Sequence, residues 1–408
     1  MSPSLRFPEF TGEWKEERLS EIADIYKGAG ISKDQLSDNG EPCILYGELY
    51  TKYKTETITE VISRTDIDNT KLVRSKANDV IIPCSGETAE DIATARCVIK
   101  DGILLGGDLN IIRLHNYDGS FVSYQLNGKR KYDIAKVAQG VSVVHLYGEH
   151  LKGVKTVNPC LAEQKKISRF LSLLDERIAV QNRLIEDLKK LRCAIIENVF
   201  CSPNHNESAL RFKGNTDPLS TYRMEDFCSR ITRKNKDNQC SLVLTIAAQY
   251  GLVDQESFFN KTVASENLAG YYLLHKGEFA YNRSYSAGYD WGAVKRLEKY
   301  PEGVLSTLYI CFKIDESAVD SDYLAYYFES TKWHKGLSDI AGEGARNHGL
   351  LNVSVNDYFN TRHRFHCMRE QKIIASMLNV ISQKENDEIA LYDNYQKQKQ
   401  YLLRKMFI

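Results

Sequence analysis

One helix-like stretch is written twice in this chain. The first copy, EQKKISRFLSLLDERI, begins at Glu163, and the second copy, EQKIIASMLNVISQKE, begins at Glu370. The two starts lie 207 positions apart, and this offset continues without a gap to Ile408. Each copy has about 40 residues without Pro or Gly, which predicts an uninterrupted helix about 60 Å long.

Apolar residues recur in both copies with a seven-residue period, as they do at the interface of a coiled coil. The residues expected at this helix interface are Ile167, Leu171, Leu174, Ile178, Leu188, Ile195, Ile374, Leu378, Ile381, Tyr395 and Leu402. Polar residues interrupt the pattern at equivalent places, with Gln181 matching Glu388 and Arg192 matching Lys399. We expect the helices to form an antiparallel coiled coil with Leu188 against Tyr395 or its neighbours. The simpler alternative is two ordinary amphipathic helices, but helices this long need a partner along their length.

The repeat extends upstream of the helices. The tripeptide LRF at Leu5 recurs at Leu210, and AQGVSVVHL from Ala138 takes the same place as AGEGARNHGLL from Ala341. Repetition on this scale predicts two copies of one unit, related by an approximate two-fold axis. The predicted segments are a globular domain at 1–160, a long helix at 161–201, a second globular domain at 202–367 and a second long helix at 368–408.

The globular segments have the pattern of an α+β fold with short strands. Strands are expected in DVIIPCSG at Asp79, GEFAYNRSYSAG at Gly277, LLGGDLNIIRL at Leu104 and VLSTLYICFKI at Val304. Aromatic residues in DYLAYYFESTKWHKGL have helical spacing. Polar loops that contain Gly, Asn, Ser, Tyr, Arg and Lys lie between the strands, and such side chains suit both DNA contacts and ordinary surface loops.

Composition limits the partners and the compartment. Lys+Arg and Asp+Glu are both 54 in 408 residues, so any nucleic-acid contact must be a local basic patch. Ten cysteines are scattered without a C-x-x-C pair, and His363, His366 and Cys367 lack a fourth metal ligand nearby. No signal peptide or membrane span is visible. We therefore expect a cytoplasmic protein with reduced thiols, no metal and no membrane contact.

These features together resemble one family. The segments LRFPEF…W…RLSEIADIYKG, YGELYTKY and GARNHGLLNVSVNDYF, with the two EQKKI/EQKII helices, are similar to DNA-specificity subunits of type I restriction–modification systems. The resemblance covers essentially the whole chain and rests on the combination of motifs rather than on any single one.

The resemblance implies a division of work between the segments. The two globular domains would be target-recognition domains, each reading one half of a bipartite sequence in double-stranded DNA. The paired helices would act as a ruler and dock two modification (methyltransferase) subunits, and restriction/translocase subunits would join the complex. S-adenosylmethionine, ATP and Mg would bind the partner subunits, and this chain would bind no cofactor.

The residues themselves argue against catalysis by this chain. No G-x-x-x-x-G-K-[ST] loop is present, and the NPC at Asn158 fails as an Asn-Pro-Pro-aromatic methyltransferase site. The EQK at Glu163 and Glu370 mimics part of a nuclease motif, but glutamate is also favoured at a helix start by the helix dipole. A freestanding nuclease or methyltransferase therefore stays open as an alternative, and so does a coiled-coil scaffold that binds protein.

The candidate DNA contacts are polar and aromatic loop residues. Arginine pairs with guanine and asparagine with adenine in the major groove, and lysine suits phosphate. In the second domain the candidates are Arg283, Tyr285, Arg346, Asn347 and His348, with Lys295 and Arg296 on phosphate. In the first domain they are Tyr50, Lys52, Tyr53, Lys54, Ser85, Lys129, Arg130 and Lys131.

Overall fold

The computed structural model describes residues 2–68, 71–140, 143–214, 217–261, 267–284, 288–340, 346–347, 350–351 and 353–408, with the backbone alone at 346, 347 and 350. The chain divides into two units. The first unit comprises Met1–Arg183 and Ile389–Ile408, and the second comprises Leu184–Glu388. Both dividing points fall inside the long helices α7 (Leu161–Val199) and α12 (Met368–Met406), so each helix contributes to both units.

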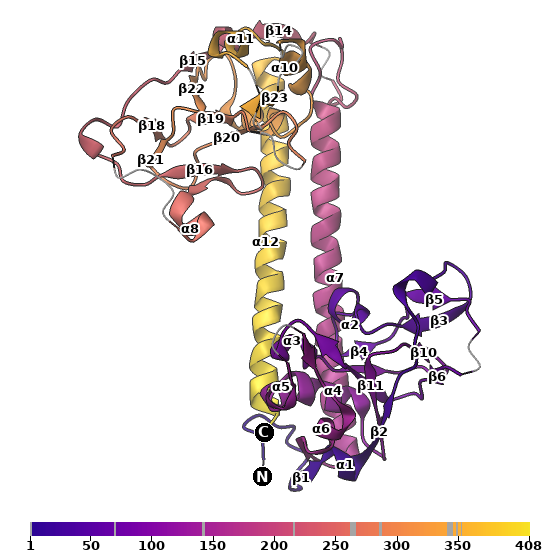
Figure 1. Ribbon diagram of the computed structural model, residues 1–408. Coiled ribbons are helices and arrows are strands. Elements are labelled where there is room, and N and C mark those ends of the chain that lie inside the picture. Colours follow the sequence, from indigo (N-terminus) through magenta and orange to yellow (C-terminus); the bar gives the residue numbers. More distant parts are fainter. Residues whose placement is uncertain are drawn as a thin grey trace. The chain divides into compact units, whose positions relative to one another are not determined.

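The first unit mixes short helices with small sheets (Figure 1). Its strands are β1 (Lys15–Arg18), β2 (Ala23–Lys27), β3 (Glu41–Ile44), β4 (Thr57–Ile58), β5 (Ser63–Thr65), β6 (Val73–Arg74), β7 (Asp79–Pro83), β8 (Ser85–Gly86), β9 (Arg96–Val98), β10 (Leu104–Leu105), β11 (Leu109–Leu114), β12 (Val144–His145) and β13 (Lys155–Asn158). Its helices, besides its parts of α7 and α12, are α1 (Leu19–Ile22), the 3-10 turn η1 (Lys33–Gln35), α2 (Glu48–Thr51), α3 (Ala89–Ile92), α4 (Gly119–Asn127), α5 (Lys131–Val137) and α6 (Gly148–Lys152).

The second unit has the same kind of architecture. Its strands are β14 (Ser220–Arg223), β15 (Cys228–Arg230), β16 (Leu244–Ala247), β17 (Gly251–Asp254), β18 (Tyr272–His275), β19 (Phe279–Asn282), β20 (Ala293–Arg296), β21 (Glu302–Leu305), β22 (Ile310–Ile314), β23 (Arg346–Asn347), β24 (Leu350–Leu351) and β25 (Arg362–Phe365). Its helices, besides its parts of α7 and α12, are η2 (Met224–Asp226), η3 (Lys236–Asn238), α8 (Gln255–Phe259), α9 (Ser321–Tyr327), α10 (His334–Ile340) and α11 (Val355–Phe359).

The two units share a strand order. The main sheet of the first unit runs β2-β11-β7-β9-β4, and that of the second runs β15-β22-β19-β20. In each unit an outer antiparallel pair, β1 with β13 or β14 with β25, joins the first strand to the last strand before the long helix. The expected strands at β7, β11, β19 and β22 are confirmed, and the internal repeat therefore extends from the sequence to the sheet topology.

The two long helices run in opposite directions within each unit. In the first unit Asp175 of α7 lies 2.6 Å from Lys399 of α12, and the Arg177 guanidinium lies 4.9 Å from the centroid of the Tyr395 ring. The sequence led us to expect Leu188 opposite Tyr395. In an antiparallel pair, however, equivalent positions of a repeat face each other only near its midpoint, and at Tyr395 the neighbour is Arg177 instead.

The residues expected at the helix interface are buried or half-buried. In the first unit these are Ile167, Leu171, Leu174, Ile178, Tyr395 and Leu402, and in the second they are Leu188, Ile195, Ile374, Leu378 and Ile381. The helices end at Val199 and Met406, before the expected ends at 201 and 408, and the aromatic residues that follow turn into the cores.

Each core contains the end of a helix that begins in the other repeat. In the first unit Phe407, which follows α12, packs on Phe121 of α4 with ring centroids 5.2 Å apart. In the second unit Phe200, which follows α7, packs on Tyr323 of α9 with centroids 5.0 Å apart. Phe200 and Phe407 lie 207 positions apart, so the same position of the repeat closes both cores.

We expect Phe407→Ala to destabilise the first unit and Phe200→Ala to destabilise the second. Truncating a fully buried phenylalanine costs about 3–5 kcal/mol. Hydrogen exchange followed by mass spectrometry measures the loss of protection in each unit separately. Tyr401→Ala is the matched control, because that ring on α12 is 57% exposed. Protection that is unchanged in both units after both truncations would show that these rings do not close the cores.

Candidate nucleic-acid interface

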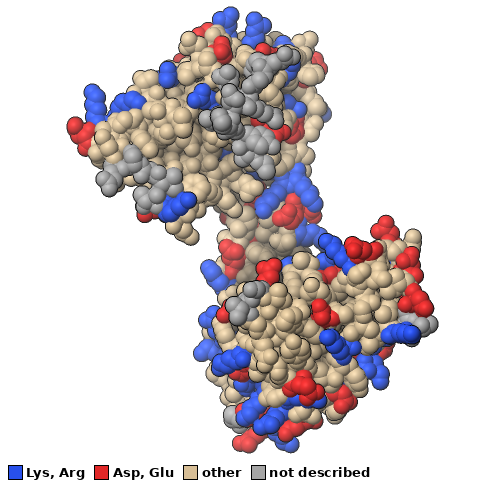
Figure 2. Space-filling view, viewed as in Figure 1, with Lys and Arg blue, Asp and Glu red and all other residues tan. Residues whose placement is uncertain are grey.

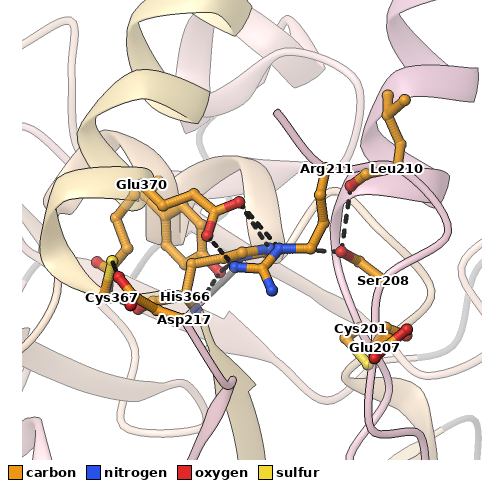
Figure 3. Close-up of polar contacts among 11 residues, drawn as sticks. Cys201, Glu207, Ser208, Leu210, Arg211, Asp217, His366, Cys367 and Glu370 are labelled. Carbon is orange, nitrogen blue, oxygen red and sulfur yellow. Dashed lines mark hydrogen bonds and ion pairs between the residues drawn. The ribbon is translucent and has the colours of Figure 1, made fainter. Parts of the chain in front are cut away.

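A buried glutamate at the start of each long helix pairs with an arginine near the start of the same repeat. Glu163 accepts hydrogen bonds from Arg6 Nε at 2.7 Å and Nη2 at 2.8 Å, and from Trp14 Nε1 at 3.3 Å. Glu370 pairs with both Arg211 Nε and Nη2 in the same two-pronged way (Figure 3). The glutamates of the EQK motif are therefore structural partners of the arginines of the LRF motif.

The glutamine that follows each of these glutamates connects the helix to the globular part of its unit. Gln164 Oε1 accepts from the backbone N–H of Asp118 at 2.9 Å, and Gln371 Oε1 accepts from Asp320 at 2.8 Å. Asp118 and Asp320 in turn cap the N-termini of α4 and α9. The repeated EQ dipeptide thus fixes a second helix against each long helix.

A cation from the incoming helix bridges two carboxylates in each unit. In the first unit Lys399 of α12 lies 2.6 Å from Asp175 and 2.7 Å from Glu56. Burial would lower the pKa of Lys399, but the two carboxylates hold it above its ordinary value. In the second unit Arg192 of α7 lies 2.5 Å from Glu329 and 3.2 Å from Glu385. The basic interruptions of the helix interface, Arg192 and Lys399, are thus both paired.

The candidate metal ligands of the second unit have other partners. His363 Nδ1 lies 3.0 Å from the Tyr327 hydroxyl, and His366 Nδ1 lies 2.8 Å from the Tyr323 hydroxyl. Burial lowers the pKa of His363 to about 3 and that of His366 to about 4. The Cys367 thiol donates to Asp217 at 3.3 Å, as Figure 3 shows. Over the described ranges no group of three or more His, Cys, Asp or Glu residues could hold a metal ion.

Three of the candidate DNA contacts of the first unit line one pocket. Tyr50 of α2 donates to the Ser85 carbonyl at 3.0 Å, and Lys54 Nζ donates to the Tyr50 carbonyl at 2.6 Å. These residues, with others, line a pocket of about 760 Å³. Both residues of β8, Ser85 and Gly86, are part of the lining.

The two other candidates on this segment are already bonded within the fold. Lys52 Nζ lies 2.7 Å from the buried carboxylate of Glu48 and 2.7 Å from Ser63 Oγ. Tyr53 is buried, its hydroxyl accepts from the Ile62 N–H, and burial raises its pKa to about 12. Contact of either residue with DNA would require these interactions to break.

The basic run between α4 and α5 lies apart from that pocket. Lys129 is exposed, Lys131 is half-buried at the start of α5, and Arg130 lies 3.4 Å from Asp133. None of the three lines the pocket beside Tyr50. Their contact with DNA stays a prediction.

The candidates of the second unit differ in how far they are already bonded. Arg283 donates to the carbonyls of Val353 at 3.0 Å and Leu308 at 3.1 Å, which makes it a loop anchor. Arg296 is paired with Glu298 at 3.0 Å and with Asp322 at 2.7 Å, so its charge is balanced.

The remaining candidates are less constrained. The side-chain ammonium of Lys295 on β20 has no hydrogen bond or ion pair to any residue that the structure describes. Arg346 and Asn347 form the backbone of β23 opposite β24, and their side chains lie outside the described part, as do Tyr285 and His348.

Charge on the surface is mixed. Figure 2 shows blue basic and red acidic side chains interspersed over the face in view of each unit. Among the described residues of that face no continuous basic stripe is visible, which fits the equal numbers of basic and acidic residues.

No helix of the described chain is both long and apolar enough to cross a membrane.

Residues 11–190 match the family model of the type I restriction modification DNA specificity domain. For this part of the chain, the match confirms the resemblance noted in the sequence. A curated relative, the type I restriction enzyme MjaVIII specificity subunit of Methanocaldococcus jannaschii, is 25% identical over 197 residues. That alignment covers 48% of this chain and 43% of the relative, so the chain matches under half of that protein's length.

Solved structures extend the likeness in fold to both repeats. The S subunit of a type I restriction–modification system from M. genitalium matches with a TM-score of 0.60 and 15% identity, covering 100% of this chain and 99% of its own. A chain solved in work on complex assembly and conformational transition of the type I R-M system has a TM-score of 0.54 and 14% identity, covering 98% of both chains. At such identities the likeness concerns the fold alone.

We expect the second unit to lose stability in mild acid. The pKa values of His363 and His366 are below the ordinary 6.5 in the folded chain, so the unfolded chain binds protons first as the pH falls. At pH 5 each histidine then favours unfolding by about 2 kcal/mol relative to pH 7. Urea unfolding of a Trp14→Phe chain measures this, because Trp291 and Trp333 both report on the second unit.

The matched control for the acid effect replaces both histidines with glutamine, which retains hydrogen bonding without the titration. This double variant should lose less stability between pH 7 and pH 5 than the Trp14→Phe parent. An equal loss in both chains would assign the acid effect to other groups.

We expect Glu370→Gln to destabilise the second unit and Glu163→Gln the first. Each change leaves a partly buried arginine opposite a neutral amide, and breaking such a pair costs about 3 kcal/mol. Glu225→Gln is the matched control, because the Arg223–Glu225 pair is exposed and worth less than about 1 kcal/mol. Unfolding followed by hydrogen exchange compares the three. A loss no larger than that of the control would contradict a stabilising role for the buried pairs.

Proposed function

We propose that this chain is the DNA-specificity subunit of a type I restriction–modification complex and has no catalytic activity of its own. Each unit reads one half of a bipartite target in double-stranded DNA in the cytoplasm. Two methyltransferase subunits dock on the long helices, and restriction/translocase subunits complete the assembly. S-adenosylmethionine, ATP and Mg serve the partner subunits.

The observation that carries this proposal is that the chain contains two units with the same internal contacts, which we call the frame, and with different surfaces. Both units repeat the same sheet order, the same Arg–Glu pair and the same glutamine contact. Their surface pockets differ in size and lining. Two similar frames with different surfaces suit a target whose two halves have different sequences.

Apolar patches on the helices support docking of two identical partners. In the first unit α7 exposes Phe170 and Leu173. In the second unit Met377 and Val380 of α12 take the equivalent places 207 positions later and line an apolar groove of about 520 Å³. Exposed apolar side chains on a long helix are typical of protein interfaces. One equivalent patch in each unit supports one methyltransferase subunit for each.

The contacts of Glu163 and Glu370 weigh against the nuclease alternative. A metal-dependent nuclease needs carboxylates that are free to bind the metal. Both glutamates are buried and occupied by arginine instead. The scaffold alternative differs from our proposal in one measurable respect, since a protein-binding scaffold would confer no sequence preference on DNA methylation.

Methylation mapping tests the proposal. The chain is purified alone and together with its cognate modification subunit, and DNA exposed to each preparation is sequenced for modified adenine. We expect no modification by the chain alone. The complex should modify a motif of two half-sites separated by a fixed, unspecified gap. Modification by the rigorously purified lone chain, or modification by the complex without a motif, would refute the assignment.

A further inference from the structure

Each unit contains a pocket that combines an exposed tyrosine with cations. In the first unit the pocket of about 760 Å³ includes Tyr46, Tyr50, Lys54 and Arg96 in its lining. In the second unit a smaller pocket of about 190 Å³ includes Tyr250, Lys295 and Lys299. None of these residues takes part in the Arg–Glu pairs, the glutamine contacts, the bridging of carboxylates by Lys399 and Arg192, or the apolar patches on the long helices.

The two pockets occupy comparable places in the repeat. Tyr46 precedes a glycine just after β3, and Tyr250 precedes a glycine just after β16. In register, Arg96 of β9 pairs with Ile81 of β7, and Lys295 of β20 pairs with Ala280 of β19. Strands β9 and β20 hold the same position in their sheets. One tyrosine–glycine turn and one cation-bearing strand therefore build each pocket.

The cations of the second pocket are available to an anion. Lys295 and Lys299 form no ion pair with any residue in the described ranges, whereas Arg296 and Glu298 neutralise each other. Glu329 on the same lining is paired with Arg192. The remaining charge is positive, and it lies beside the Tyr250 ring, which is 63% exposed.

The cations of the first pocket are bonded to neutral carbonyls. Lys54 donates to the Tyr50 carbonyl at 2.6 Å, and Arg96 donates to the carbonyls of Tyr53 at 3.1 Å and Ala95 at 3.0 Å. The described residues offer neither cation a direct ion pair, although Glu87 and Asp91 on the same lining balance their formal charge. One of these two carboxylates, Asp91, accepts a hydrogen bond from the Thr88 hydroxyl.

A tyrosine beside lysine or arginine provides the two kinds of contact that sequence-reading proteins make. Cations bind phosphate oxygens and hold the protein in register, while a tyrosine presents a hydroxyl and an apolar ring to the edges of bases. We infer that these two pockets are the reading sites, with Tyr46 contacting one half of the target and Tyr250 contacting the other. This inference rests on the proposed function and specifies where each unit carries it out.

The inference assigns different effects to the aromatic and the basic residues. Tyr46→Ala should reduce discrimination at one or more positions of one half-site by about 5- to 150-fold, and Tyr250→Ala should do so in the other half-site only. Lys295→Ala and Lys299→Ala should weaken binding to all sequences and lower the slope of log affinity against log salt by about one each.

The experiment uses the complex of the full chain with its modification subunit. Methylation mapping reads the motif, and rates on duplexes with single substitutions in each half-site measure discrimination. Tyr250→Phe separates the hydroxyl from the ring and guards against a folding defect in the alanine variant. Tyr132→Ala on α5, at a ring that is 65% exposed, and Lys313→Ala on β22, at an exposed lysine, are the matched controls and should leave motif and salt slope unchanged.

The outcomes separate the inference from the function on which it rests. A wild-type complex that methylates without a motif refutes both. A wild-type complex with a motif, together with Tyr46→Ala and Tyr250→Ala variants that assemble and keep that motif and its discrimination, overturns the reading sites alone. A change in both half-sites from either single tyrosine substitution overturns them as well.

Discussion

The cores of both units depend on side chains that arrive from the other repeat. Helix α7 begins in the first unit, and Phe200, directly after its end, lies in the core of the second unit. Helix α12 begins in the second unit, and Phe407, directly after its end, lies in the core of the first. Because burial of apolar surface is the main favourable term in folding, neither globular segment has its full core without the helix of the other. Each repeat thus depends on the other for its complete core, although each has its own sheets.

Polar contacts then determine the register of this exchange. The start of each long helix is fixed to its own repeat by the Arg–Glu pair, and the incoming helix is fixed by Lys399 or Arg192. Apolar packing alone tolerates sliding by a heptad, whereas a buried charge must meet its partner. A shift of α12 along α7 in the first unit would leave Asp175 without Lys399. The polar interruptions of the heptads therefore specify alignment at some cost in stability.

Much of this frame could be predicted from the sequence, because it is periodic and repeated. The helices, their interface positions and four main strands follow from local pattern. The pairing of Arg6 with Glu163 could not be predicted in this way, even though the LRF and EQK motifs were both visible as repeats, with offsets of 205 and 207 positions. The neighbouring sequence does not distinguish a glutamate that the helix dipole stabilises from one that also pairs with an arginine 157 positions away.

The candidate reading residues were predicted less well for the same physical reason. Residue type indicates which ligand a side chain suits, but not whether a neighbour already occupies it. Lys52 and Arg296 suit phosphate, yet Glu48 and Asp322 bind them within the fold. Lys54, two positions from Lys52, bonds only a carbonyl and lines a pocket. Whether a side chain is free to bind a ligand depends on its neighbours in the folded chain. The positions of Tyr46 and Tyr250 in the pockets depend on the fold in the same way, and the sequence analysis did not select these two residues.

Duplication within one chain supplies a comparison that separates the frame from the surface. Groups that pack inside each unit recur in both. In each unit an arginine pairs with the buried glutamate, and a glutamine accepts a hydrogen bond from the aspartate that caps the neighbouring helix. In each unit a phenylalanine also lies in the core, and the incoming helix carries a paired cation. Groups that line the pockets diverge, with Arg96 in one unit where Lys295 stands in the other, and with pockets of different volume. Interior positions accept few side chains, because a change of shape or charge there costs several kcal/mol. The exposed members of the pocket linings, such as Tyr250, carry less of this restriction, so we expect a change there to alter what a unit binds without altering how it folds.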